Sequence, residues 1–162
     1  MHSPKVMIQE FDNSHRTWAR RLLNDRWGST RIVSRGRVHN ADTLSGFVAI
    51  VDGIPKGLIT YRSEEKQCEI ISLDSLLEGF GIGTGLVKAV LNVAQSSGCL
   101  RIWLITTNDN TSALCFWQRR GFKIVALYRD AVGESRKLKP EIPQLGRAGI
   151  PIRDEIELEL CL

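Results

Sequence analysis

Apolar residues follow two different spacings along the chain. Runs rich in β-branched residues, typical of strands, occupy 46–53, 54–63, 68–77, 101–107 and 122–128. Apolar residues recur every three or four positions, as on one face of a helix, in 12–23, 86–94 and 111–120. Asp52-Gly53 between two strand-like runs predicts a hairpin, and Gly98 and Gly121 are expected to end the last two helices. The pattern predicts a mixed α/β protein.

Three other segments complete the chain. Segment 28–45 is polar and rich in Gly, Ser, Thr and Arg, so we expect a loop with at most a short irregular strand. Segment 129–152 allows a helical turn up to Lys139 and then, with three prolines, an ordered loop. Residues 155–160 alternate and predict a strand with one acidic and one apolar face. With no repeat or linker, residues 1–162 are expected to form a single domain.

Composition places the chain among ordinary globular proteins. Its 43% apolar and 25% charged residues exclude general disorder. The sequence has no apolar run of membrane-spanning length and no secretory signal at its start, so we expect a cytoplasmic protein that binds no membrane. The four cysteines are widely spaced, which argues against a metal site and predicts reduced, packing thiols. They are Cys68, Cys99, Cys115 and Cys161.

Positive charge is concentrated in residues 1–40. The chain carries 22 basic and 18 acidic residues, and residues 1–40 hold eight basic against three acidic ones. A solvated helix face followed by an exposed loop explains this excess, and an anionic ligand is the alternative. No aromatic residues are interleaved with the arginines as single-strand binding requires, so nucleic acid is not expected as a partner.

A glycine-rich turn between a predicted strand and a predicted helix carries the most specific chemistry. Residues 78–85 read Glu-Gly-Phe-Gly-Ile-Gly-Thr-Gly. Glycines let the backbone approach a ligand, and the free N–H groups of the first helical turn favour a phosphate. The spacing fits neither the GxGxxG dinucleotide pattern nor the P-loop pattern. A tight turn without a ligand is the alternative interpretation.

Two motifs together resemble the GCN5-related N-acetyltransferase (GNAT) family. The first is Gly81-Ile82-Gly83, and the second runs from Asn110 to Phe122 as NTSALCFWQRRGF, against the family pattern NxxAxxFYxxxGF. The resemblance covers about residues 45–128. It implies the GNAT fold, a largely antiparallel sheet with a central splayed parallel pair and flanking helices. It also implies acetyl-CoA as cosubstrate, without a metal.

The resemblance implies three groups of cofactor-binding residues. The strand end would lie along the pantetheine arm, the glycine turn would hold the diphosphate, and the second motif would flank the cofactor. The parallel strands that end near residues 75 and 107 would splay apart to admit the thioester. The residues so implicated are Leu73, Ser75, Leu76, Phe80, Gly81, Ile82, Gly83, Thr84, Gly85, Asn110, Ala113 and Phe116.

Acetyl transfer to an amine requires removal of a proton from the alkyl ammonium. Glu69, at the same parity as Leu73 on the predicted strand, is the first candidate base, and Asp74 is the second. Trp117 stands at the catalytic position where the family often has an acidic tyrosine, so the leaving thiolate would depart without that acid or would use Tyr128 or water. The resulting hypothesis is an N-acetyltransferase, and the alternative is a GNAT-like module that binds acyl-CoA without transfer.

The acceptor is the least defined part of this hypothesis. In the GNAT fold the loop 28–45 would line the acceptor pocket, so Arg35, Arg37 and His39 are the candidate substrate-binding residues. The arginines suggest an anionic group on the amine acceptor. A small amine, an amino acid and a protein N-terminus all stay open. The oligomeric state stays open as well, with a homodimer among the options because dimers are the commonest assembly.

Overall fold

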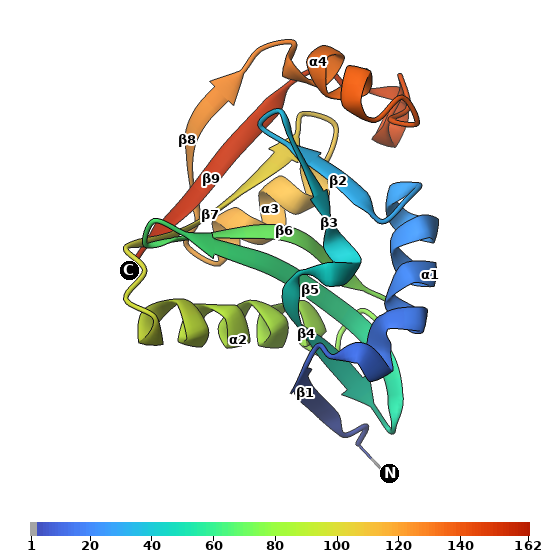
Figure 1. Ribbon diagram of the computed structural model, residues 1–162, viewed down its shortest axis with the longest axis vertical. Helices are drawn as coiled ribbons and strands as arrows, with labels where there is room; N and C mark the ends of the chain where they lie inside the picture. Colours follow the sequence, from blue (N-terminus) through green and yellow to red (C-terminus); the bar gives the residue numbers. More distant parts are fainter. Residues whose placement is uncertain (1–2) are drawn as a thin grey trace.

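A seven-stranded sheet organises residues 3–162, the part of the chain that the computed structural model describes (Figure 1). Only the β6–β7 pair is parallel, and every other neighbouring pair is antiparallel. This confirms the predicted mixed fold with a central parallel pair. In spatial order the strands are β1 (Val6–Glu10), β4 (Ser45–Val51), β5 (Ile54–Glu64), β6 (Gln67–Ser75), β7 (Arg101–Thr107), β9 (Glu155–Cys161) and β8 (Lys123–Tyr128).

Helices cover both faces of the β4–β6 part of this sheet, where the strands carry buried apolar residues on both sides. Helices α2 (Ile82–Ser96) and α3 (Thr111–Arg119) pack on one face, and α1 (Arg16–Trp27) packs on the other. Neighbouring residues of one strand point to opposite cores: Ala49 packs with α2, and Val48 packs with α1. Figure 1 shows α2 below β6, and α1 at the right of the view beside β4 and β5.

The loop prediction for residues 28–45 was wrong. This segment forms a separate two-stranded hairpin of β2 (Arg31–Ser34) and β3 (Arg37–Asn40), followed by the short helix η2 (Ala41–Thr43). The connecting Arg35 and Gly36 both have positive φ, 49° and 73°. An arginine rarely adopts this conformation, so the turn lacked the usual Asn-Gly or Asp-Gly signal. Strand β1 was not predicted either.

Segment 129–152 contains the predicted helical turn as α4 (Ala131–Leu138) and the predicted ordered loop, which includes the short helix η3 (Arg147–Gly149). Figure 1 shows α4 at the same end of the molecule as the tip of the β2–β3 hairpin. Within residues 3–162, no helix combines the length and apolar character needed to cross a membrane.

The cysteines divide into two kinds. Cys68 and Cys99 are buried in the core, as predicted, and burial raises the pKa of the Cys68 thiol to about 12. The packing interpretation was wrong for Cys115 and Cys161, which are exposed. Their neighbours along the sequence are apolar, and the sequence alone did not distinguish the outer face of α3 or the end of β9 from the core.

Candidate active site

The two parallel strands separate halfway along their length. β6 pairs with β7 from Gln67–Arg101 to Ile70–Leu104, and beyond this point both strands continue without pairing to each other. The edge of β6 from residue 71 to Ser75 therefore faces a gap in the sheet. Main-chain groups along such an edge can pair with an extended ligand as another strand would.

A β-bulge in β6 lies at the point of separation. Tyr61 pairs with Ile70 and Thr60 pairs with Ser72, so Ile71 is the extra residue. The bulge changes which side chains share a face. Glu69 and Leu73 do not share one, contrary to the predicted parity: Leu73 packs toward the α2 core, whereas Glu69 contacts the hairpin on the α1 side.

The glycine turn leads directly into α2. Gly79 and Gly81 have positive φ, 80° and 69°, and no heavy atom would lie within 4 Å of a Cβ at either position. Gly81 is the N-cap of α2 and offers no side-chain acceptor, and the first backbone bond runs from Gly85 N to Gly81 O. The N–H groups of residues 82–84 therefore remain directed out of the helix, which is the geometry that binds a phosphate.

A cation lies beside this turn. Arg120 donates from Nη2 to Thr84 Oγ1 at 2.6 Å, and its guanidinium carbon lies 3.4 Å from the centroid of the Phe116 ring. The ring in turn lies against Gly83, where a Cβ would come within 3.0 Å of it. Free amides, open glycines and a guanidinium together fit the diphosphate of coenzyme A.

Helix α3 supplies the other wall of the gap. The side chain of its N-cap Asn110 accepts a hydrogen bond from Ala113 N at 3.3 Å. Trp117 points away from the gap into the core, where its ring makes edge contacts with Phe116 and Phe122. Tyr128 donates to Glu157 Oε1 at 2.9 Å. Neither Trp117 nor Tyr128 lines the cavity described next.

A cavity of about 490 Å³ lies where the gap meets the α1 side. Leu73, Thr107 and Asn110 line it from the cofactor side. Its remaining wall comes from the end of α1, from β2, from α4 and from the loop that follows α4. The members of that wall include Trp27, Ile32, Val33, Val132, Lys139, Glu141, Ile142, Pro143 and Ile152, and Asp74 from β6 also lines the cavity.

Asp74 is the carboxylate that this cavity and the β6 edge share. Its Oδ2 accepts a hydrogen bond from the indole Nε1 of Trp27 at 2.9 Å. Burial raises the pKa of Asp74, although the Trp27 bond and the nearby Arg26 oppose that effect. A half-buried carboxylate with a raised pKa is suited to accept a proton from a bound ammonium.

Glu69 lies deeper, beneath the hairpin. Its Oε2 accepts from Ser34 Oγ at 2.6 Å, and its Oε1 lies 3.8 Å from Arg62 Nη1. Burial is the main cause that raises the pKa of Glu69, against the Ser34 bond and the arginines. Glu69 does not line the large cavity but a separate opening of about 80 Å³, together with Arg62 and Trp103.

The structure does not bring the three predicted acceptor residues to the large cavity. Arg35 donates to Glu155 Oε1 at 3.0 Å and stacks on Tyr128, and Arg37 donates to Glu64 Oε2 at 3.0 Å. His39 is buried, and within residues 3–162 its Nε2 has no hydrogen-bond partner. Burial, with Arg62 and Arg37, lowers the pKa of His39 to about 4.

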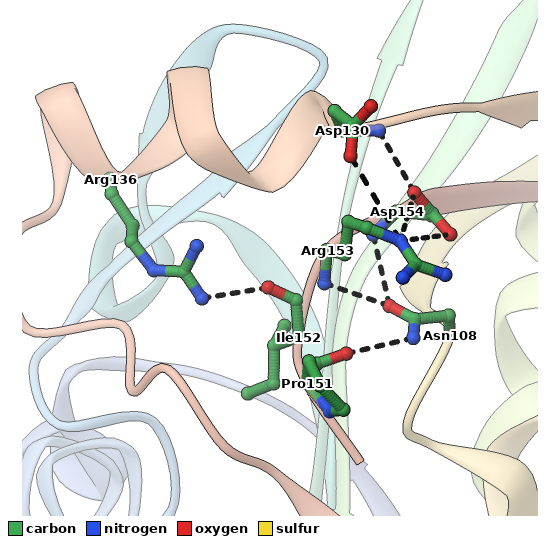
Figure 2. A network of polar contacts seen from close by, with 7 residues as sticks. All are labelled: Asn108, Asp130, Arg136, Pro151, Ile152, Arg153 and Asp154. Atoms are coloured by element: carbon green, nitrogen blue, oxygen red, sulfur yellow. Dashed lines mark hydrogen bonds and ion pairs between the residues drawn. The ribbon is translucent and has the colours of Figure 1, made fainter.

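Segment 129–152 is fixed over the cavity by side chains that bond to main chain. Figure 2 shows Asn108 bonded to both sides of the returning chain: its Nδ2 donates to Pro151 O, and its Oδ1 accepts from Arg153 N and Asp154 N, each at 2.9 Å. Arg136 donates to Ile152 O at 2.7 Å. The segment is thus a fastened cover of the cavity.

The same cover is joined to the start of α3. Asp109 Oδ2 accepts from Arg147 N at 3.2 Å, and Asp109 Oδ1 accepts from Thr107 Oγ1 at 2.6 Å. Gly146 lies so close that a Cβ there would come within 2.0 Å of Asp109 Oδ2. The cover and the cofactor wall therefore meet at Asp109.

Sequence reasoning missed Trp27 and Lys139 as site residues. Lys139 Nζ donates to Trp27 O at 2.6 Å, across 112 positions of the sequence, and Trp27 in turn bonds to Asp74 across 47. No local pattern marks such pairs. The sequence marked these two residues only by their positions, because Trp27 directly precedes the helix-ending Gly28 and Lys139 directly precedes Pro140.

Comparison with known proteins agrees with this geometry. The profile of the Acetyltransferase (GNAT) family matches residues 8–122. The uncharacterized protein YdhI of Bacillus subtilis is 45% identical over 143 residues, which cover 85% of this chain and 89% of YdhI. The chain therefore belongs to the GNAT family of acetyltransferases.

Solved structures share the fold. An IAA acetyltransferase from Bacillus cereus superimposes with a TM-score of 0.75 at 23% identity, over 98% of this chain and 100% of that one. Arabidopsis thaliana Naa50, in complex with the bisubstrate analogue CoA-Ac-MVNAL, superimposes with a TM-score of 0.70 at 19% identity, over 97% and 99%. Among the described residues of this chain, no group of three or more His, Cys, Asp or Glu side chains is placed to hold a metal ion.

Proposed function

We propose that this protein is an acetyl-CoA-dependent N-acetyltransferase that modifies a primary amine. The observation that carries the proposal is the meeting of a diphosphate-type turn, an unpaired strand edge and a carboxylate-lined cavity at one gap in the sheet. Naa50, which shares the fold, was solved with a CoA-based bisubstrate analogue. Bound in this gap, acetyl-CoA would supply the acetyl group as an activated thioester.

Different residues of the chain would contact different parts of the cofactor. The amides of residues 82–84, with Thr84 and Arg120, would hold the diphosphate, and the β6 edge from Leu73 to Leu76 would guide the pantetheine. Phe80, at the tip of the turn, and Asn110, Ala113 and Phe116, from α3, would border the cofactor. Gly85 would follow these amides in the first turn of α2, and a Cβ there would make only an ordinary contact with Ile8 at 3.5 Å, so the packing against β1 does not require glycine.

Asp74 is the proposed base, because it lines the cavity that the amine would enter. The ammonium would lose one proton to Asp74, and its nitrogen would form the new C–N bond as the C–S bond of the thioester breaks. The second proton of the nitrogen would pass through water to the departing thiolate, and Asp74 would return its proton to solvent. A thiol pKa near ~8.5 makes this departure feasible without a protein acid. Glu69 would act on the same proton only through water from its own opening.

Two variants test this assignment. We expect Asp74→Asn to lower kcat by about 10²- to 10⁴-fold, the usual contribution of a positioned base, with the Kd for CoA unchanged. We expect Glu69→Gln to lower turnover at neutral pH by less. Steady-state release of free thiol with an amine panel, and calorimetric titration with CoA, measure the two quantities. Equal turnover of Asp74→Asn and wild type would remove Asp74 from the mechanism.

The second candidate function is an acyl-CoA-binding module without transfer. The position of Trp117 favours it, because no acidic side chain from α3 reaches the cavity. Tight CoA binding with no thiol release from any amine in the panel would support the module and contradict the enzyme.

A further inference from the structure

Lys139 is an unusual cation for the wall of a cavity. Its side chain is buried, with only 4% of the residue exposed, whereas Arg26 and Arg147 on the same wall are exposed. Its ammonium donates one hydrogen bond, to Trp27 O, and no carboxylate of residues 3–162 lies within ion-pair distance of it. An ammonium carries three donors, so two remain for a ligand.

The two glutamates that line the same cavity, Glu141 and Glu155, already have partners. Glu141, the nearest acid along the chain, pairs with Arg31 at 3.3 Å, and Glu155 pairs with Arg35. Burying a cation without a directly paired counter-ion is unfavourable. Burial accordingly lowers the pKa of Lys139, although the nearby Glu141 opposes this effect. A bound anion would remove that penalty.

Trp27 forms hydrogen bonds to both Lys139 and Asp74. Its carbonyl oxygen accepts from Lys139 Nζ at 2.6 Å, and its indole Nε1 donates to Asp74 Oδ2 at 2.9 Å. One residue thus separates a positive group from a negative group, and both line the same cavity. Apolar side chains line the same cavity, among them Ile32 and Val33 from β2 and Ile142 from the cover.

From this arrangement, and resting on the proposed acetyltransferase function, we infer that the acceptor is a small amino carboxylate. Its ammonium binds at Asp74, its carboxylate binds at Lys139, and its carbon skeleton lies against the apolar wall. The cover that lines one side of the cavity is held in place by Asn108 and Arg136, which favours a compact acceptor over an extended polypeptide.

The test compares three amines that share an apolar body and differ at the carboxylate: L-phenylalanine, L-phenylalaninamide and 2-phenylethylamine. Lys139→Gln keeps a donor for Trp27 O and removes the charge. We expect this variant to raise KM for phenylalanine at least tenfold and to leave KM for the other two amines within about twofold, with kcat little changed. Lys137→Gln, on the exposed side of α4, is the matched control and should match wild type.

Each outcome decides the inference. If Lys139→Gln changes all three amines alike, or if wild type does not prefer the carboxylate, the inference is overturned. If no amine is turned over while CoA binds, calorimetric titration of the CoA complex with phenylalanine and its amide repeats the comparison, and equal or absent binding of the two overturns the inference. Absence of CoA binding would instead overturn the proposed function.

Discussion

The two sides of the gap in the sheet differ in which groups form them, main chain on one side and side chains on the other. The cofactor side relies on main chain: glycines with positive φ, unbonded amides at the start of α2 and the unpaired edge of β6. The acceptor side relies on buried charged side chains, Glu69, Asp74 and Lys139, held by partners distant in sequence. The proposed cofactor site therefore rests mainly on main-chain geometry, with Thr84 and Arg120 beside it, whereas the proposed acceptor site rests on side chains.

The two sides should also respond differently to acid. The sharpest case is His39 in β3, whose pKa is about 4 in the folded protein against an ordinary value of 6.5. As the pH falls, the imidazole of His39 is protonated in the unfolded chain before it is protonated in the folded protein. The contribution of neutral His39 to the free energy of unfolding is therefore fully present above pH 6.5 and is lost as the pH falls from 6.5 to 4. This difference between the two pKa values corresponds to about 3 kcal/mol in the free energy of unfolding.

Substituting His39 by glutamine gives the largest expected effect, on the dependence of stability on pH. Urea unfolding at pH 7 and pH 4.5 should show that His39→Gln loses much less stability than wild type over this interval. Hydrogen exchange in wild type should show the β2–β3 hairpin losing protection in acid before α2 does. An equal loss of stability in both proteins would contradict the contrast between the two sides.

The second largest effect is expected on the free energy of unfolding when Gly146, where the two sides meet, is substituted. A methyl group there would lie within 2.0 Å of Asp109 Oδ2 and 2.8 Å of Ile152. We expect Gly146→Ala to lower the free energy of unfolding by about 1–3 kcal/mol, as overpacking does. Gly133→Ala in α4 is the matched control, because no atom lies within 4 Å of its added methyl. Equal stability of the two variants in urea would show that the cover is not fixed at this corner.

The smallest effect should arise on the cofactor side. Gly83→Ala places a methyl 3.0 Å from the Phe116 ring, which must shift and carry the stacked Arg120 with it. We expect the Kd for CoA to rise about fivefold, or roughly 1 kcal/mol. The KM for the amine should stay constant, since the acceptor wall is untouched. Calorimetry and steady-state kinetics give the two values, and a change in KM alone would reverse the assignment of the two sides.

The helices and strands around the proposed cofactor side were predicted well from the sequence. The glycine turn, the α2 and α3 motifs and the strands around them are local patterns, and the structure places the predicted elements within a few residues of their expected ends. Asp52-Gly53 was recognised as a hairpin because its sequence is typical of positive φ at two successive positions.

The acceptor side was predicted poorly for physical reasons. The β2–β3 hairpin turns at Arg35-Gly36, where tertiary contacts with Glu155 and Tyr128 hold an arginine in a rarely populated conformation. The bulge at Ile71 reversed the parity between Glu69 and Leu73, and alternation alone cannot reveal an inserted residue. The pairing of Lys139 with Trp27 depends on how the chain returns over the sheet.

The contact between Gly146 and Asp109 has a consequence for how this protein could acquire a new acceptor. Because the roof of the pocket shares its anchor with the beginning of α3, lengthening or shortening that roof would displace the neighbouring Asn110 as well. Diversification of specificity is therefore expected through exchange of inward-facing side chains such as Ile142 and Val132, at constant loop length. A mutant library for directed evolution would retain more soluble, CoA-competent members if it observed that restriction.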